Sequence, residues 1–327
     1  MLRYVGKRIL MLIPVMLGVS LLVFCMIYFT PGDPAEYMLG VDATPEAVQE
    51  LREELGLNGS FLQQYLRYIG RIVTRFDFGT SYTTHRTVTT EILDRFPNTF
   101  RLALLSMVLS SVLGIILGII SATKQYSIFD NLASAFALIG TSMPSFWFGL
   151  MLIIWFSLGL KWFPPSGFDT PAQWVLPTIC LGLGSTATVT RQTRSSMLEV
   201  IRQDYIVTAR AKGQKEIVVV LKHGLKNAMM PIITVIGNSF GVHLGGAMLT
   251  ETVFSIPGIG KMMVDAINIK NYPVVQGGVL FIALCSSVVN LLVDLLYAWL
   301  DPRIKAQYSK KKVKKAAPKQ EEKKEAA

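Results

Sequence analysis

Charged residues, cysteine and histidine are scarce in this sequence, and each scarcity excludes a class of protein. Charged side chains make up 17% of the 327 residues, whereas ordinary soluble proteins carry about 25%. The uncharged stretches approach the roughly 20 apolar residues that cross a bilayer, and hydrophobic residues reach 51% of the chain. This composition predicts a multi-pass membrane protein and excludes an intrinsically disordered chain.

Motifs for enzymatic chemistry are also missing. The three cysteines each lie in an apolar segment and are too few for a disulfide scaffold. The three histidines include no HExxH pair, and Gly260-Lys261 is followed by Met262 instead of the hydroxyl residue of a Walker A motif. We therefore expect no metal site, no catalytic residue and no cofactor on this chain.

Six apolar segments are predicted to span the membrane. The first is too long for a signal-peptide core and is followed by no small-residue cleavage site, so we expect it to be retained. Pro144 is expected to kink or interrupt the third segment, and the fourth is short and rich in glycine and hydroxyl residues. The six segments are 9–29, 102–123, 132–160, 175–190, 231–250 and 279–300.

The distribution of Lys and Arg predicts the orientation. Of the 32 basic residues, 22 fall in the two termini and in the loops after the second and fourth segments, and 10 fall on the other side. The basic side is normally cytoplasmic, so both termini are predicted to be cytoplasmic.

The predicted organisation has four parts. Residues 1–29 hold the N-terminus and first span, and 30–101 form an extracytoplasmic helical region in which Thr44 caps a helix that starts at Pro45. Residues 102–306 form the transmembrane core with a cytoplasmic loop at 191–230, and 307–327 form a disordered lysine-rich tail. The tail could alternatively hold anionic lipid weakly.

Polar residues inside the predicted spans have competing interpretations. Ser239 lies in a G-x-S-x-G sequence, but Gly237, Gly241 and Gly245 also form a ladder that favours helix packing over a nucleophile. Asp294 could contact a substrate amine, relay protons or form a packing hydrogen bond, for instance to hydroxyls of the fourth span. The candidates for the translocation path or for packing are Asp294, Ser185, Thr186, Thr188, Asn238 and Ser239.

The loop 191–230 carries two amphipathic stretches separated by Gly213. One runs along 197–209 and the other along 217–228, with eight basic residues in the loop. Two helices meeting at a glycine would form a rigid projection that docks a soluble partner. An amphipathic pair lying on the membrane and a DNA-binding helix-turn-helix are the alternatives, the latter improbable beside six spans.

The sequence DYIVTARAKG at 204–213 resembles the EAA loop of ABC importer permeases, specifically the dipeptide, oligopeptide and nickel subgroup. Supporting segments are 31–34 (PGDP), 144–147 (PSFW), 251–260 (ETVFSIPGIG), 272–276 (YPVVQ) and the DLLY to DPR sequence at 294–303. The glutamate of the general motif falls on Val207, whereas its second alanine and its glycine fall on Ala209 and Gly213.

This resemblance implies an all-α ABC type I importer permease with six transmembrane helices in a bacterial inner membrane. It implies a second homologous permease, two cytoplasmic ATPases that bind ATP and Mg, and an extracytoplasmic substrate-binding protein, with no nucleic acid. Phe254, Pro257 and Gly258 become candidates for an external gate. The implied ATPase-docking residues are Thr208, Ala209, Arg210, Ala211, Lys212, Gly213, Gln214, His223 and Asn227.

Short peptides are the expected cargo. Nickel and glutathione are alternatives within the same family. A proton-coupled secondary transporter that uses Asp294 is a rival from another class, but such folds usually show two related halves, which this sequence lacks.

Overall fold

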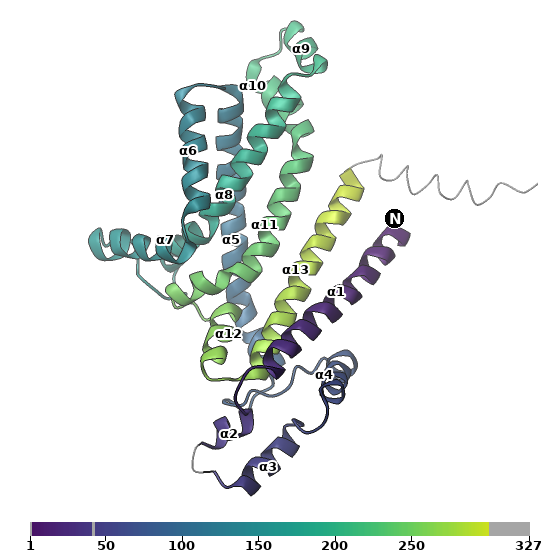
Figure 1. Ribbon diagram of the computed structural model, residues 1–327. Coiled ribbons are helices and arrows are strands. Elements are labelled where there is room, and N and C mark those ends of the chain that lie inside the picture. The colour runs from purple at the N-terminus through teal and green to yellow at the C-terminus, as the bar shows by residue number, and fades with distance from the viewer. Residues whose placement is uncertain (1, 41–42, 301–327) are drawn as a thin grey trace, which may run out of the picture.

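Helices dominate the computed structural model, which describes residues 2–40 and 43–300. The described residues contain no strand, only one isolated bridge between Thr80 and Thr87. Figure 1 shows a bundle of long helices with α9 (Asp204–Ala211) and α10 (Glu216–Val218) at one end and α2 (Pro34–Leu39), α3 (Pro45–Glu54) and α4 (Phe61–Arg75) at the other. The predicted all-α class is confirmed.

Four long helices are apolar enough to cross a bilayer. They are α1 (Leu2–Tyr28), α5 (Val88–Thr123), α11 (Lys226–Val253) together with the helical turns that precede it, and α13 (Tyr272–Leu300). A bent helix pair raises the number to five within the described residues. The helix α8 (Pro171–Ile201) has 31 residues but falls outside this set, and the count of six spans stays a prediction.

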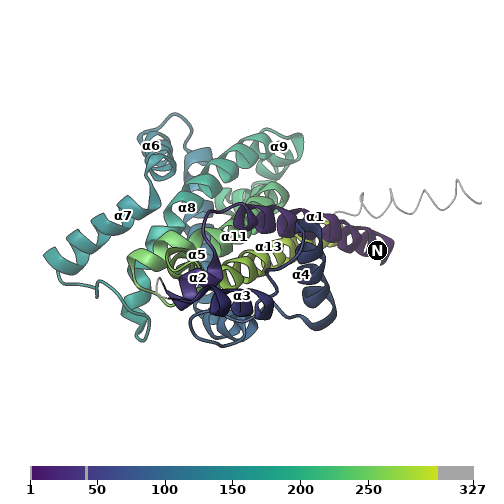
Figure 2. The same ribbon diagram turned by 60° about the horizontal axis from the view of Figure 1, so that its bottom comes forward.

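The bent pair contains the predicted proline break. The helix α6 (Ile128–Ser142) ends just before Pro144, and α7 (Ser145–Leu152) continues into a π-helical segment, η1 (Ile153–Gly159). The two parts meet at 107°, because proline lacks the N–H and the space that an uninterrupted helix needs. As a result, α7 points away from the bundle (Figure 2).

Small residues let α5 and α8 pack closely. An added Cβ at Gly118 would lie 2.4 Å from the Cβ of Thr193, and one at Gly114 would lie 2.6 Å from the Cβ of Val189. The Ser110 hydroxyl donates to the carbonyl of Gly182 across this interface at 3.0 Å. The interface therefore depends on the absence of side chains at the two α5 glycines.

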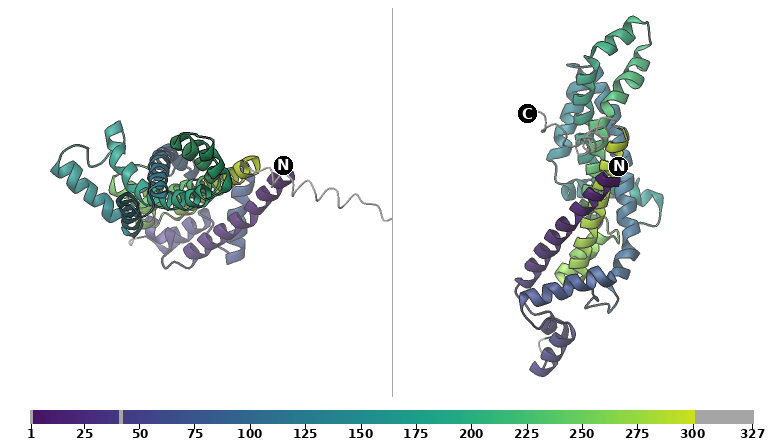
Figure 3. Two further views of the ribbon diagram at one scale, coloured as in Figure 1. Left: turned by 90° about the horizontal axis from the view of Figure 1, so that it is seen from above. Right: turned by 90° about the vertical axis from the view of Figure 1, so that its right-hand side faces the viewer.

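In the predicted extracytoplasmic region, α2 packs on α3 and α4 packs on the end of α1. Thr44 caps α3 by accepting from the N–H of Ala47, and Pro45 is the first helical residue, as predicted. Phe24 of α1 contacts the rings of Tyr65 and Tyr68 on α4. The helix α1 itself lies along α13 (Figure 3).

Candidate functional site

A helical projection at the α9 end contains the predicted docking residues. The chain leaves α8 at Ile201, bends, and forms α9, then α10 and the π-helical segment η2 (Val219–Leu225), which leads into α11. Ile206 and Ala209 are buried against Val200 and Val219. The projection is therefore packed onto the bundle by one face of α9.

The predicted single amphipathic stretch over 197–209 is wrong in one respect. The structure divides it between α8, which continues to Ile201, and α9, with a break at Arg202 and Gln203. The start of this stretch belongs to the same helix as the fourth predicted span. That apolar span was predicted to end at Thr190, where basic residues begin, but α8 continues to Ile201, because arginine is a good helix former.

Gly213 forms the elbow of the projection. Its φ is +75°, and its N–H donates to the carbonyl of Arg210 while the N–H of Gln214 reaches the carbonyl of Ala209. These two bonds form a Schellman motif, in which glycine adopts the left-handed conformation without steric cost. Nothing lies within 4 Å of a Cβ built on Gly213, so the backbone conformation and not local space requires glycine.

Side-chain bonds hold the two arms of the elbow together. Arg210 makes a two-point contact with Glu216, at 3.1 Å from Nε to Oε2 and 2.7 Å from Nη2 to Oε1. The Nε2 of His223 lies 2.8 Å from the Gln214 Oε1, and Asn227 donates to the carbonyl of His223 at 2.8 Å. The predicted docking residues on both sides of Gly213 are thus brought together, and most of them contribute to the shape of the elbow.

Several apolar side chains of the projection are exposed. Val207, the position of the motif's glutamate, is 58% exposed, and Ile217 is 67% exposed. Tyr205 and Leu221 are also exposed, with Lys212 and Lys215 nearby in the chain. Exposed apolar side chains are typical of a surface that binds another protein.

The polar candidates in the bundle core have partners that favour packing. Thr186 and Thr188 donate to the carbonyls of Gly182 and Gly184, four residues earlier in the same helix. The Ser185 hydroxyl lies 2.6 Å from the Nε2 of His243 on α11. These bonds satisfy polar groups that would otherwise be costly in an apolar interior.

The glycine ladder on α11 serves helix packing. A Cβ at Gly237 would lie 2.1 Å from a methyl group of Val293 on α13, and Ser286 donates to the carbonyl of Gly241 at 3.2 Å. Ser239 lies between these glycines within a continuous helix, where a nucleophile elbow does not form. Asn238 is exposed.

Asp294 has a different partner from the one expected. Its carboxylate accepts from Arg8 of α1 at 2.6 Å, with the two side chains 23% and 43% exposed. The expected example, the hydroxyl groups of the fourth span, is therefore incorrect, because those hydroxyls bond within α8 and to His243. The acid joins the first and last long helices of the described chain.

A buried cluster around Glu251 underlies the external-gate candidates. The side chain of Glu251 accepts from Thr99 of α5 at 2.6 Å and from the N–H of Lys261 at 2.9 Å. Thr99 in turn accepts from the N–H of Ile259 at 2.9 Å. A Cβ on Gly258 would lie 2.2 Å from the Glu251 carboxylate, so this glycine permits the loop to fold over the acid.

The other two gate candidates are also held in place. Pro257 accepts from the side chain of Asn98 at 3.1 Å. Phe254 is 1% exposed and packs in an apolar cluster with Leu152, Trp174 and Ile256. In this conformation the loop after α11 is packed against the bundle rather than open to solvent. Glu251 itself was not singled out from the sequence.

The chain resembles known transport proteins over nearly its full length. Residues 114–306 match the family described as "Binding-protein-dependent transport system inner membrane component", and residues 1–103 match the N-terminal family of such membrane components. A dipeptide transport system permease protein, DppB, from Alkalihalophilus pseudofirmus is 43% identical, covering 93% of this chain and 100% of the relative. A glutathione transport system permease protein, GsiC, from Escherichia coli is 42% identical, covering 93% and 99%.

A solved structure has the same fold at low sequence identity. The MetNI methionine ABC transporter in an inward-facing conformation matches with a TM-score of 0.53 and 17% identity, covering 65% of this chain and 97% of that one. The helix bundle and the matches to these proteins thus define a transmembrane permease of an ABC importer. The chain belongs to the family of binding-protein-dependent transport system inner membrane components. Components of this class work with ATPases and a substrate-binding protein.

Proposed function

We propose that this chain forms half of the translocation path of an ATP-driven importer for short peptides. The braced elbow at Gly213 and the exposed apolar side chains beside it are the observation that carries the proposal. A loop that only connects two helices needs neither a braced elbow nor exposed apolar side chains. The 43% identity to a dipeptide transport system permease supports peptides as the cargo.

The proposed assembly contains this chain, a second homologous permease, two cytoplasmic ATPases and an extracytoplasmic binding protein. ATP and Mg bind to the ATPases, and ATP hydrolysis takes place there rather than on this chain. The predicted docking residues, from Thr208 to Gln214 with His223 and Asn227, would contact one ATPase. The helices α2 to α4 and the loop after α11 would face the binding protein.

The proposed mechanism is alternating access driven from the elbow. Closure of the ATPases moves α9, whose buried residues Ile206 and Ala209 transmit the displacement to the ends of α8 and η2. Because η2 continues directly into α11, the movement reaches the opposite end of the bundle along one helix. The Arg210–Glu216 contact keeps the two arms of the elbow from separating under load.

Uptake by the complete transporter distinguishes the cargoes. Proteoliposomes that contain both permeases, the ATPases and the binding protein should accumulate labelled dialanine on addition of ATP and Mg. Accumulation of glutathione or a nickel chelate but not dialanine would replace the peptide assignment, and glutathione is the second candidate because a glutathione permease is 42% identical. Uptake by this chain alone, driven by a proton gradient, would contradict the importer proposal.

A further inference from the structure

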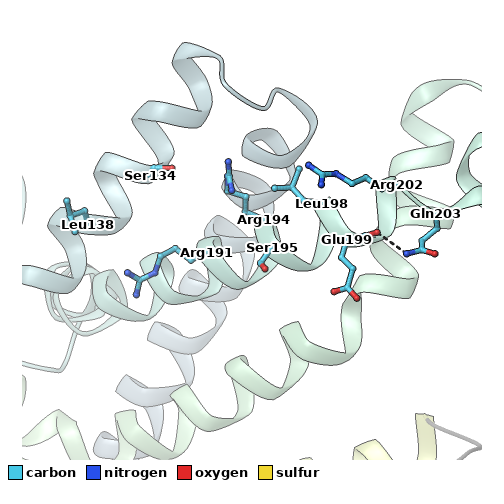
Figure 4. A pocket seen from close by; sticks show the side chains of 9 residues that line it. All are labelled: Ser134, Leu138, Arg191, Arg194, Ser195, Leu198, Glu199, Arg202 and Gln203. Carbon is cyan, nitrogen blue, oxygen red and sulfur yellow. Dashed lines mark hydrogen bonds between the residues drawn. The ribbon is translucent and has the colours of Figure 1, made fainter.

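A basic groove lies between α6 and the final turns of α8, on the side of the bundle that ends in α9. It has a volume of about 900 Å³ and is lined on the α8 side by Arg191, Arg194 and Arg202 and on the α6 side by Ser134 and Leu138 (Figure 4). Spacings of three and eleven residues put the three arginines within about 80° of one another around a helix with 3.6 residues per turn. One face of α8 is therefore strongly basic.

Two of these arginines are available to a ligand. Arg194 is already fixed by Asp130, at 2.7 Å from Nε to Oδ1 and 2.8 Å from Nη2 to Oδ2. In the described part of the chain, the side chains of Arg191 and Arg202 make no hydrogen bond or ion pair, whereas the backbone N–H of Arg202 donates to the carbonyl of Val200. Glu199 also lines the groove, but Figure 4 shows its carboxylate pointing away from Arg194 and Arg202. The groove thus has two guanidinium groups, those of Arg191 and Arg202, that no acid pairs with among the described residues.

The surroundings of the groove indicate that the anion that would pair with Arg191 and Arg202 belongs to a lipid. The outer surface of α6 is apolar, with Leu132, Leu138 and Ile139 between 55% and 65% exposed. A groove with an apolar edge and a basic wall matches a molecule with acyl chains and a phosphate. The distribution of Lys and Arg predicts that this end is cytoplasmic, and basic pockets between helices on that side bind anionic headgroups.

We propose that the groove between α6 and α8 binds the headgroup of an anionic phospholipid, with Arg191 and Arg202 contacting phosphate oxygens. The two arginine Cα atoms lie about 16 Å apart along the helix, which accommodates a headgroup with two phosphates or two neighbouring lipids. Arginine presents its donors in a planar fork that matches phosphate geometry. The groove contains none of the predicted docking residues, although Arg202 and Gln203 at its edge lead directly into α9.

Native mass spectrometry of the complete transporter in detergent tests the proposal. The complex is titrated with phosphatidylglycerol or phosphatidylcholine, and the retained lipid is counted. Each basic residue near the lipid is expected to contribute about fivefold in affinity, so an Arg191→Gln, Arg202→Gln double variant should bind phosphatidylglycerol about 25-fold more weakly. Lys124→Gln is the matched control, since Lys124 is exposed at the same end of the bundle and outside the groove.

The outcomes separate the lipid from other occupants. Equal retention of phosphatidylglycerol by the wild type and the double variant, or an equal loss in Lys124→Gln, would overturn the proposal. Displacement of the lipid by millimolar inorganic phosphate would identify a site for free phosphate instead. Binding to the isolated chain but not to the complex would show that the second permease covers the groove.

A conservative variant guards against misfolding. Arg191→Lys with Arg202→Lys keeps the charge but loses the planar fork. It should retain phosphatidylglycerol over phosphatidylcholine at an affinity between those of the wild type and the glutamine variant. Complete loss of this preference in a monodisperse lysine variant would also count against the proposed arginine contacts with phosphate.

Discussion

Replacing Thr99 by valine should destabilise the end of the bundle opposite the elbow at Gly213. Thr99 is 1% exposed and Glu251 is fully buried, and the threonine hydroxyl connects the Glu251 carboxyl group to the N–H of Ile259. Valine keeps the shape but removes both bonds. The backbone N–H loses its acceptor and the carboxyl group loses one of its donors, at a cost of about 2–4 kcal/mol for two buried polar groups.

Thermal unfolding of the purified complex measures this effect. For a chain of this size, 1 kcal/mol corresponds to about 2–3 °C, so the midpoint should fall by about 4–12 °C. Thr123→Val, at an exposed position of the same helix, should change it by less than about 2 °C, and Thr99→Ser should recover most of the loss. An unchanged midpoint for Thr99→Val would refute the assignment of Thr99 as the bridge.

The remaining predictions concern the elbow, the ion pair and the helix interface. Gly213→Val should impose about 1–2 kcal/mol of left-handed backbone strain and lower co-purification of the ATPases about tenfold. Gly70→Val, at an exposed helical position, should leave co-purification unchanged. Equal ATPase recovery with the two variants would contradict the proposed role of the elbow in docking. Arg8→Gln and Asp294→Asn should each lower the thermal midpoint, and the double variant should lose less than their sum; loss of uptake in Asp294→Asn alone would indicate a direct transport role for the acid. Gly118→Ala should cost about 1–3 kcal/mol, measured as a lower thermal midpoint, because the added Cβ meets α8 at 2.4 Å; an unchanged midpoint would show that the interface can adjust.

Local signals in the sequence predicted three of the boundaries, whereas α5 begins 14 residues before the predicted segment at 102 and α8 ends 11 residues after the predicted end at 190. Thr44 and Pro45 start α3, Pro144 separates α6 from α7, and Gly213 ends the turn after α9. Each of these residues acts through the backbone of its own neighbours, by a hydrogen bond, a missing N–H or a positive φ. Such effects depend on a few adjacent residues and are therefore visible without a structure.

Contacts between distant parts of the chain were not predictable in the same way. Thr99 and Glu251 are separated by 152 positions, and no periodic pattern connects them. From the sequence, Arg8 counted only as one of the basic residues of the N-terminus, whereas in the structure it is the ion-pair partner of Asp294. Pairing of buried polar groups depends on how helices pack, which hydropathy and helix periodicity do not determine.

The helix α11 connects the two best-defined polar sites of the protein. It has 28 residues, or about 42 Å at 1.5 Å per residue, with η2 and the elbow at Gly213 before its start and Glu251 in its last turn. Glycines at 237 and 241 face α13 along the way, where Val293 and Ser286 pack closely against them. If ATPase closure moves the elbow, α11 must either carry the Glu251 cluster with it or break the bonds to Thr99. Thr99→Val removes those bonds in advance, so a variant that is less stable and hydrolyses ATP without substrate faster than the wild type would show that they restrain the outer end of α11 in the resting transporter. A rate equal to that of the wild type would contradict this restraint.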